Sequence, residues 1–124
     1  MFKYYADVNE AKYPQGAYDG DTIDFTIDCG FANLRNERIR VLGINTPELR
    51  GRSKEEGIKA RDFTRKWLAE GRERAKVAGC KWPFTVQTEK ADAFGRYLAY
   101  IVRVCDGASL TAALVKEGYP VYMK

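Results

Sequence analysis

The chain has 124 residues, 45% of them hydrophobic, and a formal net charge of +4. This length predicts a single domain over residues 1–124 with a modest core, and the sequence has no apolar run near the roughly 20 residues that a membrane helix needs. The absence of histidine excludes mechanisms that use an imidazole as base, nucleophile or metal ligand.

The N-terminal part of the chain predicts two strands with a turn between them. Residues 2–9 are compatible with a first strand, and the Asp-Gly pair at 19–20 is a tight-turn signal. Apolar residues then occupy every second position of 22–28, which is the period of a half-buried strand. Asp21 shares the parity of these apolar residues, so we expect its side chain to point toward the core at the open end of the strand.

A third strand is predicted over residues 37–44, apolar on both faces near its end and therefore central in the sheet. It leads into a polar tip, Asn-Thr-Pro-Glu, at 45–48. The strand also carries Arg40, and a guanidinium in an apolar strand is costly unless an anion meets it. Two interpretations stay open for that anion: a bound phosphate, or an internal acid such as Asp21.

A helix and two further strands follow. Ser53 with Glu56 fits a capping box at the start of the helix. Apolar residues recur at helical spacing until Gly71, which is expected to end the helix. Residues 82–88 and 96–104 have the character of strands.

The C-terminal part predicts a second helix. The Asp-Gly turn at 106–107 precedes Ser109, a good N-cap, and Gly118 is expected to close the helix. Three strands, a helix, two strands and a helix make an α+β domain. A five-stranded barrel with the helices packed on it is compatible, because closure hides strand edges in so small a chain.

The charges are unevenly distributed. Residues 50–81 contain eleven Lys and Arg against five Asp and Glu, whereas residues 1–30 contain six acids against two lysines. A basic belt beside an acidic pocket suits a polyanion held at a metal-dependent site. Arg61, Arg65 and Lys66 are the candidate nucleic-acid contacts in this belt; the alternative is a solvated helix face.

The cysteines and the N-terminal residues indicate the cellular compartment in which the protein works. Cys29, Cys80 and Cys105 form no C-x-x-C pair, which argues against zinc and indicates reduced thiols that pack as small apolar residues. The N-terminus lacks the apolar core of a secretion signal. We therefore expect a cytoplasmic protein, or a secreted one whose signal peptide has been removed.

Three ordered motifs give the chain a family resemblance. They are Asp-Gly-Asp-Thr at 19–22, Gly-Ile-Asn-Thr-Pro-Glu at 43–48 after the strand with Arg40, and Asp-Ala-Phe-Gly-Arg-Tyr-Leu-Ala-Tyr-Ile at 92–101. Together they resemble the staphylococcal nuclease (thermonuclease) family over about 19–118. The resemblance implies an OB-fold barrel and calcium-dependent hydrolysis of DNA or RNA that leaves 3′-phosphates.

The resemblance also implies roles for single residues. Asp21 and the backbone carbonyl of Thr46 correspond to calcium ligands, and Glu48 corresponds to the general base for the attacking water. Arg40 and Arg96 correspond to the arginines that hold the scissile phosphate. These roles agree with the residue chemistry, because a carboxylate replaces the missing histidine and arginines stabilise developing negative charge.

The chain departs from the family pattern at several positions. Asn45 stands where the family usually has a second calcium-binding aspartate, so we expect an amide ligand and weaker calcium binding. Ala93 replaces a lysine that often touches a nucleotide phosphate. The nucleotide-stacking tyrosine corresponds to Tyr119 or Tyr122, with packing of the closing helix as the alternative role.

Two functional hypotheses follow. The first is a calcium-dependent nuclease that acts on DNA or RNA as a monomer, without a membrane. The second is a non-catalytic nuclease-like module that binds nucleic acid or protein on an OB barrel, and Asn45 is the sequence feature that supports it.

Overall fold

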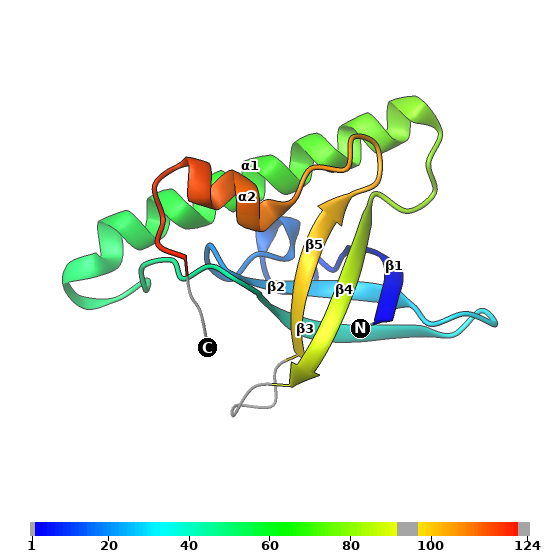
Figure 1. The fold of residues 1–124 in the computed structure, drawn as a ribbon, viewed down its shortest axis with the longest axis horizontal. Coiled ribbons are helices and arrows are strands. Elements are labelled where there is room, and N and C mark those ends of the chain that lie inside the picture. The colour runs from blue at the N-terminus through cyan, green and yellow to red at the C-terminus, as the bar shows by residue number, and fades with distance from the viewer. Residues whose placement is uncertain (1, 92–96, 122–124) are drawn as a thin grey trace.

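The computed structural model describes residues 2–91 and 97–121, with side chains for all of them except 89–91. Five strands close into a barrel in the order β1-β2-β3-β5-β4, and two helices pack on it (Figure 1). The α+β prediction is therefore confirmed. The strands are β1 (Phe2–Val8), β2 (Thr22–Asp28), β3 (Leu34–Val41), β4 (Phe84–Ala91) and β5 (Tyr97–Arg103).

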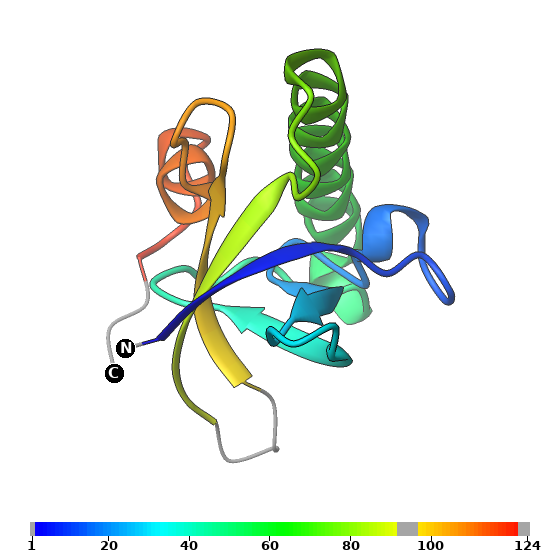
Figure 2. The same cartoon turned by 90° about the vertical axis from the view of Figure 1, so that its right-hand side faces the viewer.

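The helices are α1 (Lys54–Ala78) and α2 (Leu110–Lys116), with short 3₁₀ turns η1 (Pro14–Gly16) and η2 (Gly51–Ser53). All strand pairs are antiparallel except β3 with β5, which run parallel and close the barrel. The helices α1 and α2 stand on the same side of the barrel, as the turned view in Figure 2 shows. Neither α1 nor α2 is long and apolar enough to cross a lipid bilayer, a finding that covers the described residues.

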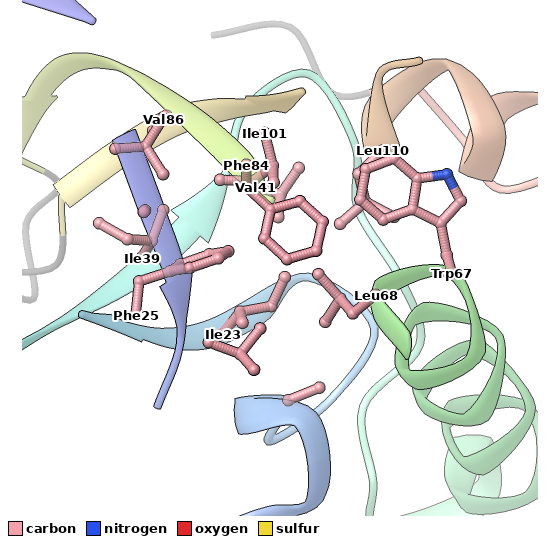
Figure 3. Packing of buried hydrophobic residues seen from close by; sticks show 14 of the residues in the cluster. Ile23, Phe25, Ile39, Val41, Trp67, Leu68, Phe84, Val86, Ile101 and Leu110 are labelled. Carbon is pink, nitrogen blue, oxygen red and sulfur yellow. The ribbon is translucent and has the colours of Figure 1, made fainter. Parts of the chain in front are cut away.

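The core fills the barrel and the space between the barrel and the helices (Figure 3). The inward face of β2 is apolar, as the alternation predicts, with Ile23 and Phe25 fully buried. Trp67 of α1 stacks on Phe84 of β4 with ring centroids 5.9 Å apart. Burying a side chain of this size contributes roughly 1.5–3 kcal/mol, so these contacts fix α1 against the barrel.

The structure corrects the predicted end of the first helix. Gly71 lies buried inside α1, where an added Cβ would come within 2.7 Å of Arg103 Cδ and 2.8 Å of Phe84 Cε1. Gly71 therefore allows close packing of the helix on the barrel and does not end it. The helix ends at Gly79, whose φ of 75° is left-handed, and the amide of Cys80 donates to the carbonyl of Ala75 at 2.8 Å.

Two further expectations differ from the structure. The third strand lies at 34–41 and not at 37–44, because the chain leaves the sheet at Leu42 and turns at Gly43, whose φ is 81°. The cysteines are free, but none is buried: Cys29 is exposed, and the other two are partly exposed.

Candidate metal and phosphate site

The site predicted from the motifs lies at one end of the β2–β3 hairpin. Thr22 at the start of β2 pairs with Arg40 near the end of β3, and the amide of Val41 donates to the carbonyl of Asp21 at 2.8 Å. This register brings the Asp-Gly-Asp turn beside the exit of β3. The site is therefore built on the rigid edge of the barrel, in the region below α1 in Figure 1.

Asp21 is buried, with 5% of its surface exposed, so the predicted inward orientation is confirmed. Its Oδ2 accepts a hydrogen bond from the amide of Thr46 at 2.9 Å and lies 3.4 Å from Arg40 Nη1. Its Oδ1 accepts from the hydroxyl of Thr22 at 3.3 Å. Asp21 thus connects the start of β2, the strand arginine and the loop after β3.

Arg40 is held over this loop by its own hydrogen bonds. Its Nη1 donates to the carbonyls of Val41 at 2.8 Å and Ile44 at 3.0 Å, and Nη2 donates to Asn45 Oδ1 at 3.2 Å. A guanidinium has five N–H donors. Three are used in these hydrogen bonds, and Nη1 also pairs with Asp21 at 3.4 Å, so an internal acid meets this guanidinium. Two N–H groups, Nε and one on Nη2, make no hydrogen bond among the described residues.

Thr46 is packed tightly against the turn that carries Asp21. A Cβ at Gly20 would lie 2.8 Å from Thr46 Oγ1 and 2.9 Å from the Cβ of Ala60 on α1, so only glycine fits there. The hydroxyl of Thr64, also on α1, donates to the carbonyl of Gly20 at 2.8 Å. The buried Thr46 Oγ1 has no hydrogen-bond partner among the described residues.

Glu48 lies two residues further along the same loop and is largely exposed. Its side chain is 78% exposed and lies 4.0 Å from Arg50 Nε. Its backbone is fixed by the start of α1, because a Cβ at Gly57 would come within 2.3 Å of the Glu48 carbonyl oxygen. The position of the Glu48 main chain therefore depends on the packing of the first turn of α1.

The predicted capping box is wrong. α1 does begin after Ser53, but this serine makes no cap hydrogen bond to the helix. Its hydroxyl donates to the carbonyls of Glu48 at 3.0 Å and Arg50 at 3.1 Å. Ser53 thus anchors the loop that carries the candidate base, a role that local sequence pattern cannot show because both partners are backbone atoms.

Asp19 is a second carboxyl group beside Asp21. Its Oδ1 accepts from the amide of Asp21 at 3.1 Å. Burial, followed by the charge of Asp21, raises the pKa of Asp19 to about 7. The sequence predicts a turn at Asp19 and assigns it no role in the site, whereas the structure places its carboxyl group beside Asp21.

The C-terminal segment supports the site from the other side. The amide of Asn45 donates to the carbonyl of Pro120 at 3.1 Å, and Ile44 forms a β-bridge with Val121. Tyr119 is half-buried and packs against the hydrophobic core. Burial raises its pKa, and this environment fits the packing role for Tyr119.

The three candidate nucleic-acid contacts of the basic belt have different environments on α1. Arg65 donates two hydrogen bonds to the carbonyl of Ala17, at 2.9 and 3.1 Å, and its pKa is lowered by burial and then by the charge of Arg61. Arg61 pairs with Asp62 at 3.1 Å, and Lys66 is exposed. Arg65 therefore anchors η1 to α1, whereas Lys66 faces solvent.

Part of the predicted site lies outside the described residues. This holds for Arg96, for Ala93 beside it in the same motif, and for Tyr122. Among the described site residues, Asp21, Arg40, Asn45 and Thr46 are joined by two hydrogen bonds and one ion pair.

The oxygen donors beside Arg40 are of the kinds that Ca²⁺ takes. Asp21 offers a carboxylate, Asn45 an amide oxygen and Thr46 a backbone carbonyl, and Asp19 lies beside Asp21. Arg40 already pairs with Asp21 and donates to Asn45 Oδ1, so a cation here would compete with its guanidinium. Among the residues that the structure describes, no group of three or more Asp, Glu, Cys or His side chains gathers for a metal.

Comparison with protein-family models assigns the chain to a family. The family model described as staphylococcal nuclease homologue matches residues 38–124, which is well over half of the sequence. The chain belongs to this family, and its five-stranded barrel with two helices is an OB-fold of that type. A search of curated proteins returns no match.

Proposed function

We propose that this protein is a calcium-dependent nuclease that hydrolyses phosphodiesters of DNA or RNA by attack of water at phosphorus and leaves 3′-phosphates. The observation that carries the proposal is the junction of Asp21, Arg40 and the 45–48 loop at one end of the barrel. Family membership supports a nuclease-like or nucleic-acid-binding domain. The finer assignment rests on the chemistry of these residues.

Arg40 binds the scissile phosphate in this proposal. Its guanidinium is fixed by two backbone carbonyls, by Asn45 and by its ion pair with Asp21, and its two remaining N–H groups would meet the phosphate. A preorganised donor stabilises the charge that develops on the phosphoryl oxygens, and it does so without reorganising during the reaction. Arg96 is the second arginine of this clamp by its place in the family motif.

Glu48 accepts the proton of the attacking water. It is exposed at the loop tip and has its main chain fixed by Ser53 and Gly57. A carboxylate is the natural base in a chain without histidine. Asp21, Asn45 and the Thr46 carbonyl would hold the cation, which supplies Lewis-acid stabilisation of the phosphoryl oxygens when bound.

Replacement of the base tests this assignment. We expect Glu48→Gln to reduce turnover of single-stranded DNA by about 10²- to 10⁴-fold, because general-base catalysis is lost. Binding of DNA and the unfolding temperature should stay close to wild type, since Glu48 is exposed. End-labelled products from the wild type should carry 3′-phosphates.

Glu73→Gln is the matched control, because it makes the same chemical change at an exposed residue of α1. It should keep near-wild-type turnover. Near-full activity of Glu48→Gln would remove Glu48 from the mechanism.

A non-catalytic nucleic-acid-binding module is the second candidate. Asn45 favours it, because one formal charge is missing from the cation ligands. A folded wild-type protein that binds DNA but does not cut it at any calcium concentration would select this function.

A further inference from the structure

Two tyrosines and an arginine form a partly exposed cluster beside the candidate site. The rings of Tyr13 and Tyr18 meet edge to face with centroids 5.3 Å apart. The Arg38 guanidinium carbon lies 5.6 Å from the Tyr13 centroid and 6.0 Å from the Tyr18 centroid. Two hydrogen bonds to Asp24, at 2.8 and 3.2 Å, hold Arg38 in this position. Tyr18 remains 41% exposed although it belongs to this cluster.

The Tyr13–Tyr18–Arg38 cluster is continuous with the candidate site. The amide of Tyr18 donates to the carbonyl of Thr22 at 3.0 Å, so Tyr18 directly precedes the turn that carries Asp21. Arg38 lies two residues before Arg40 on β3. Alternate residues of a strand share one face at a spacing of about 7 Å. Arg38 of the cluster therefore lies next to Arg40 of the proposed phosphate site on the same face of β3.

Arg38 also lines a groove of about 390 Å³. The lining includes Asn9, Lys12 and Asn36, and also the acids Asp24 and Glu37. Asparagine amides can donate to and accept from base edges. Because the two acids balance the charges of Lys12 and Arg38, the groove offers hydrogen-bond partners for a base and no net positive charge.

Positive charge approaches the cluster from α1 as well. Arg65 donates to the carbonyl of Ala17, the residue before Tyr18, and Arg61 lies close enough to lower the pKa of Arg65. Figure 2 shows the η1 turn beside α1, which is the contact that these hydrogen bonds make. Exposed aromatic rings with arginines around them are the pattern of single-strand binding surfaces.

We infer that the Tyr13–Tyr18–Arg38 cluster is a stacking subsite for a nucleobase of single-stranded nucleic acid, adjacent to the phosphate at Arg40. The inference rests on the proposed function, because it extends the path of the substrate from the cleavage site. Tyr18 provides the exposed ring, Tyr13 supports it from the side, and Arg38 adds a cation–π contact. A base inside a duplex is stacked between its neighbours and has no free face for the ring, so the subsite favours unpaired bases.

Fluorescence of 2-aminopurine tests this inference. A short single-stranded oligodeoxynucleotide with 2-aminopurine at successive positions is titrated with the full chain in EDTA, where a metal-dependent nuclease does not cut. We expect quenching at one or two adjacent positions. The Tyr18→Ala variant should bind the oligonucleotide about 5- to 150-fold more weakly than the wild type, because one base loses its stacking partner.

Three further variants control for packing. Tyr18→Leu keeps an apolar side chain and should lose the quenching, whereas Tyr18→Phe should keep it. Tyr5→Ala removes a tyrosine that is 53% exposed on β1 and should bind as wild type does. Unfolding temperatures of all variants show that each is folded.

The outcomes separate this inference from the nuclease proposal. Unchanged binding and quenching in Tyr18→Leu would overturn the subsite, and cleavage by the same variant would leave the nuclease standing. Tyr18-dependent binding without any cleavage in calcium would support the subsite and reject the nuclease. Absence of single-strand binding by the wild type would overturn the subsite.

Discussion

Asn45 offers an amide oxygen at a position where a carboxylate would add a negative charge to the cation ligands. Its Oδ1 already accepts from Arg40 Nη2 at 3.2 Å, so a carboxylate fits the same place. Because calcium affinity follows the charge of the ligands, Asn45→Asp should lower the calcium concentration at half-maximal cleavage. Asn33→Asp, in the exposed turn before β3, is the matched control. An unchanged midpoint in Asn45→Asp would show that residue 45 is no ligand.

Asp19 makes the metal-free protein sensitive to pH. The pKa of Asp19 in the folded state is about 7, above the usual value for an aspartate, chiefly because the side chain is partly buried. Between about pH 4 and 7 the folded state therefore holds a proton that the unfolded state has released, so stability falls as pH rises through this range and levels off above it. In EDTA, Asp19→Asn should gain unfolding temperature relative to wild type as pH rises from 5 to 8. A difference that is constant across this range would contradict the shifted pKa.

At the scale of elements, the first turn of α1 positions the loop that carries Glu48. Gly57→Ala would add about 1 kcal/mol of helix propensity. Against this, its Cβ would lie 2.3 Å from the Glu48 carbonyl oxygen, and overpacking of that kind typically costs about 1–3 kcal/mol. We expect a net loss of stability and a lower kcat, because the helix and the loop must move apart.

Glu73→Ala is the matched control for this variant, since residue 73 is exposed on the same helix. Urea unfolding and steady-state kinetics measure both effects. A Gly57→Ala protein that is more stable than wild type and equally active would show that the loop adapts freely.

The features of the fold that could be predicted depend on residues close in sequence, and most of the others depend on residues that are distant in sequence. The alternation of β2, the N-cap Ser109 and the inward Asp21 depend on neighbours in sequence, and the structure agrees with each. The role of Gly71 depends on Arg103 and Phe84, which only the closed barrel brings near. Ser53 bonds to backbone carbonyls three and five residues before it, and the residue pattern of the loop does not distinguish this from a helix cap. A glycine in a helix looks the same in sequence whether it ends the helix or allows a strand to approach.

The site shows the same division. Its motif residues could be named from the sequence, and the pairing of Asp21 with Arg40 was one of two interpretations for that arginine. The anchoring of Asn45 by Pro120 could not be predicted, because the fold brings these two distant segments together. Asp19 and Asp21 are close in sequence, but the partial burial that shifts the pKa of Asp19 depends on the packing around the turn.

At the scale of the whole molecule, the uneven charge distribution predicts salt-dependent binding. Each phosphate contact of a single strand contributes about 0.7 to the slope of log affinity against log salt. Lys66→Gln should therefore flatten the slope by about this amount if Lys66 contacts a phosphate. Lys116→Gln, at an exposed position of α2, is the control. If Lys66→Gln and Lys116→Gln have the same slope, Lys66 makes no phosphate contact and lies on a solvated helix face.

Arg65→Gln should instead lower the unfolding temperature, because two hydrogen bonds to Ala17 are lost.

Cleavage of single-stranded DNA by the full chain across a calcium titration tests the central claim most directly. The measurement includes an EGTA arm and the unfolding temperature of the same sample. The residues of the site predict cleavage that requires calcium, vanishes in EGTA and has a midpoint set by a cation site with one carboxylate, Asp21, and neutral oxygens. A folded protein that cuts no DNA or RNA even at saturating calcium would contradict the nuclease and leave the nucleic-acid-binding module.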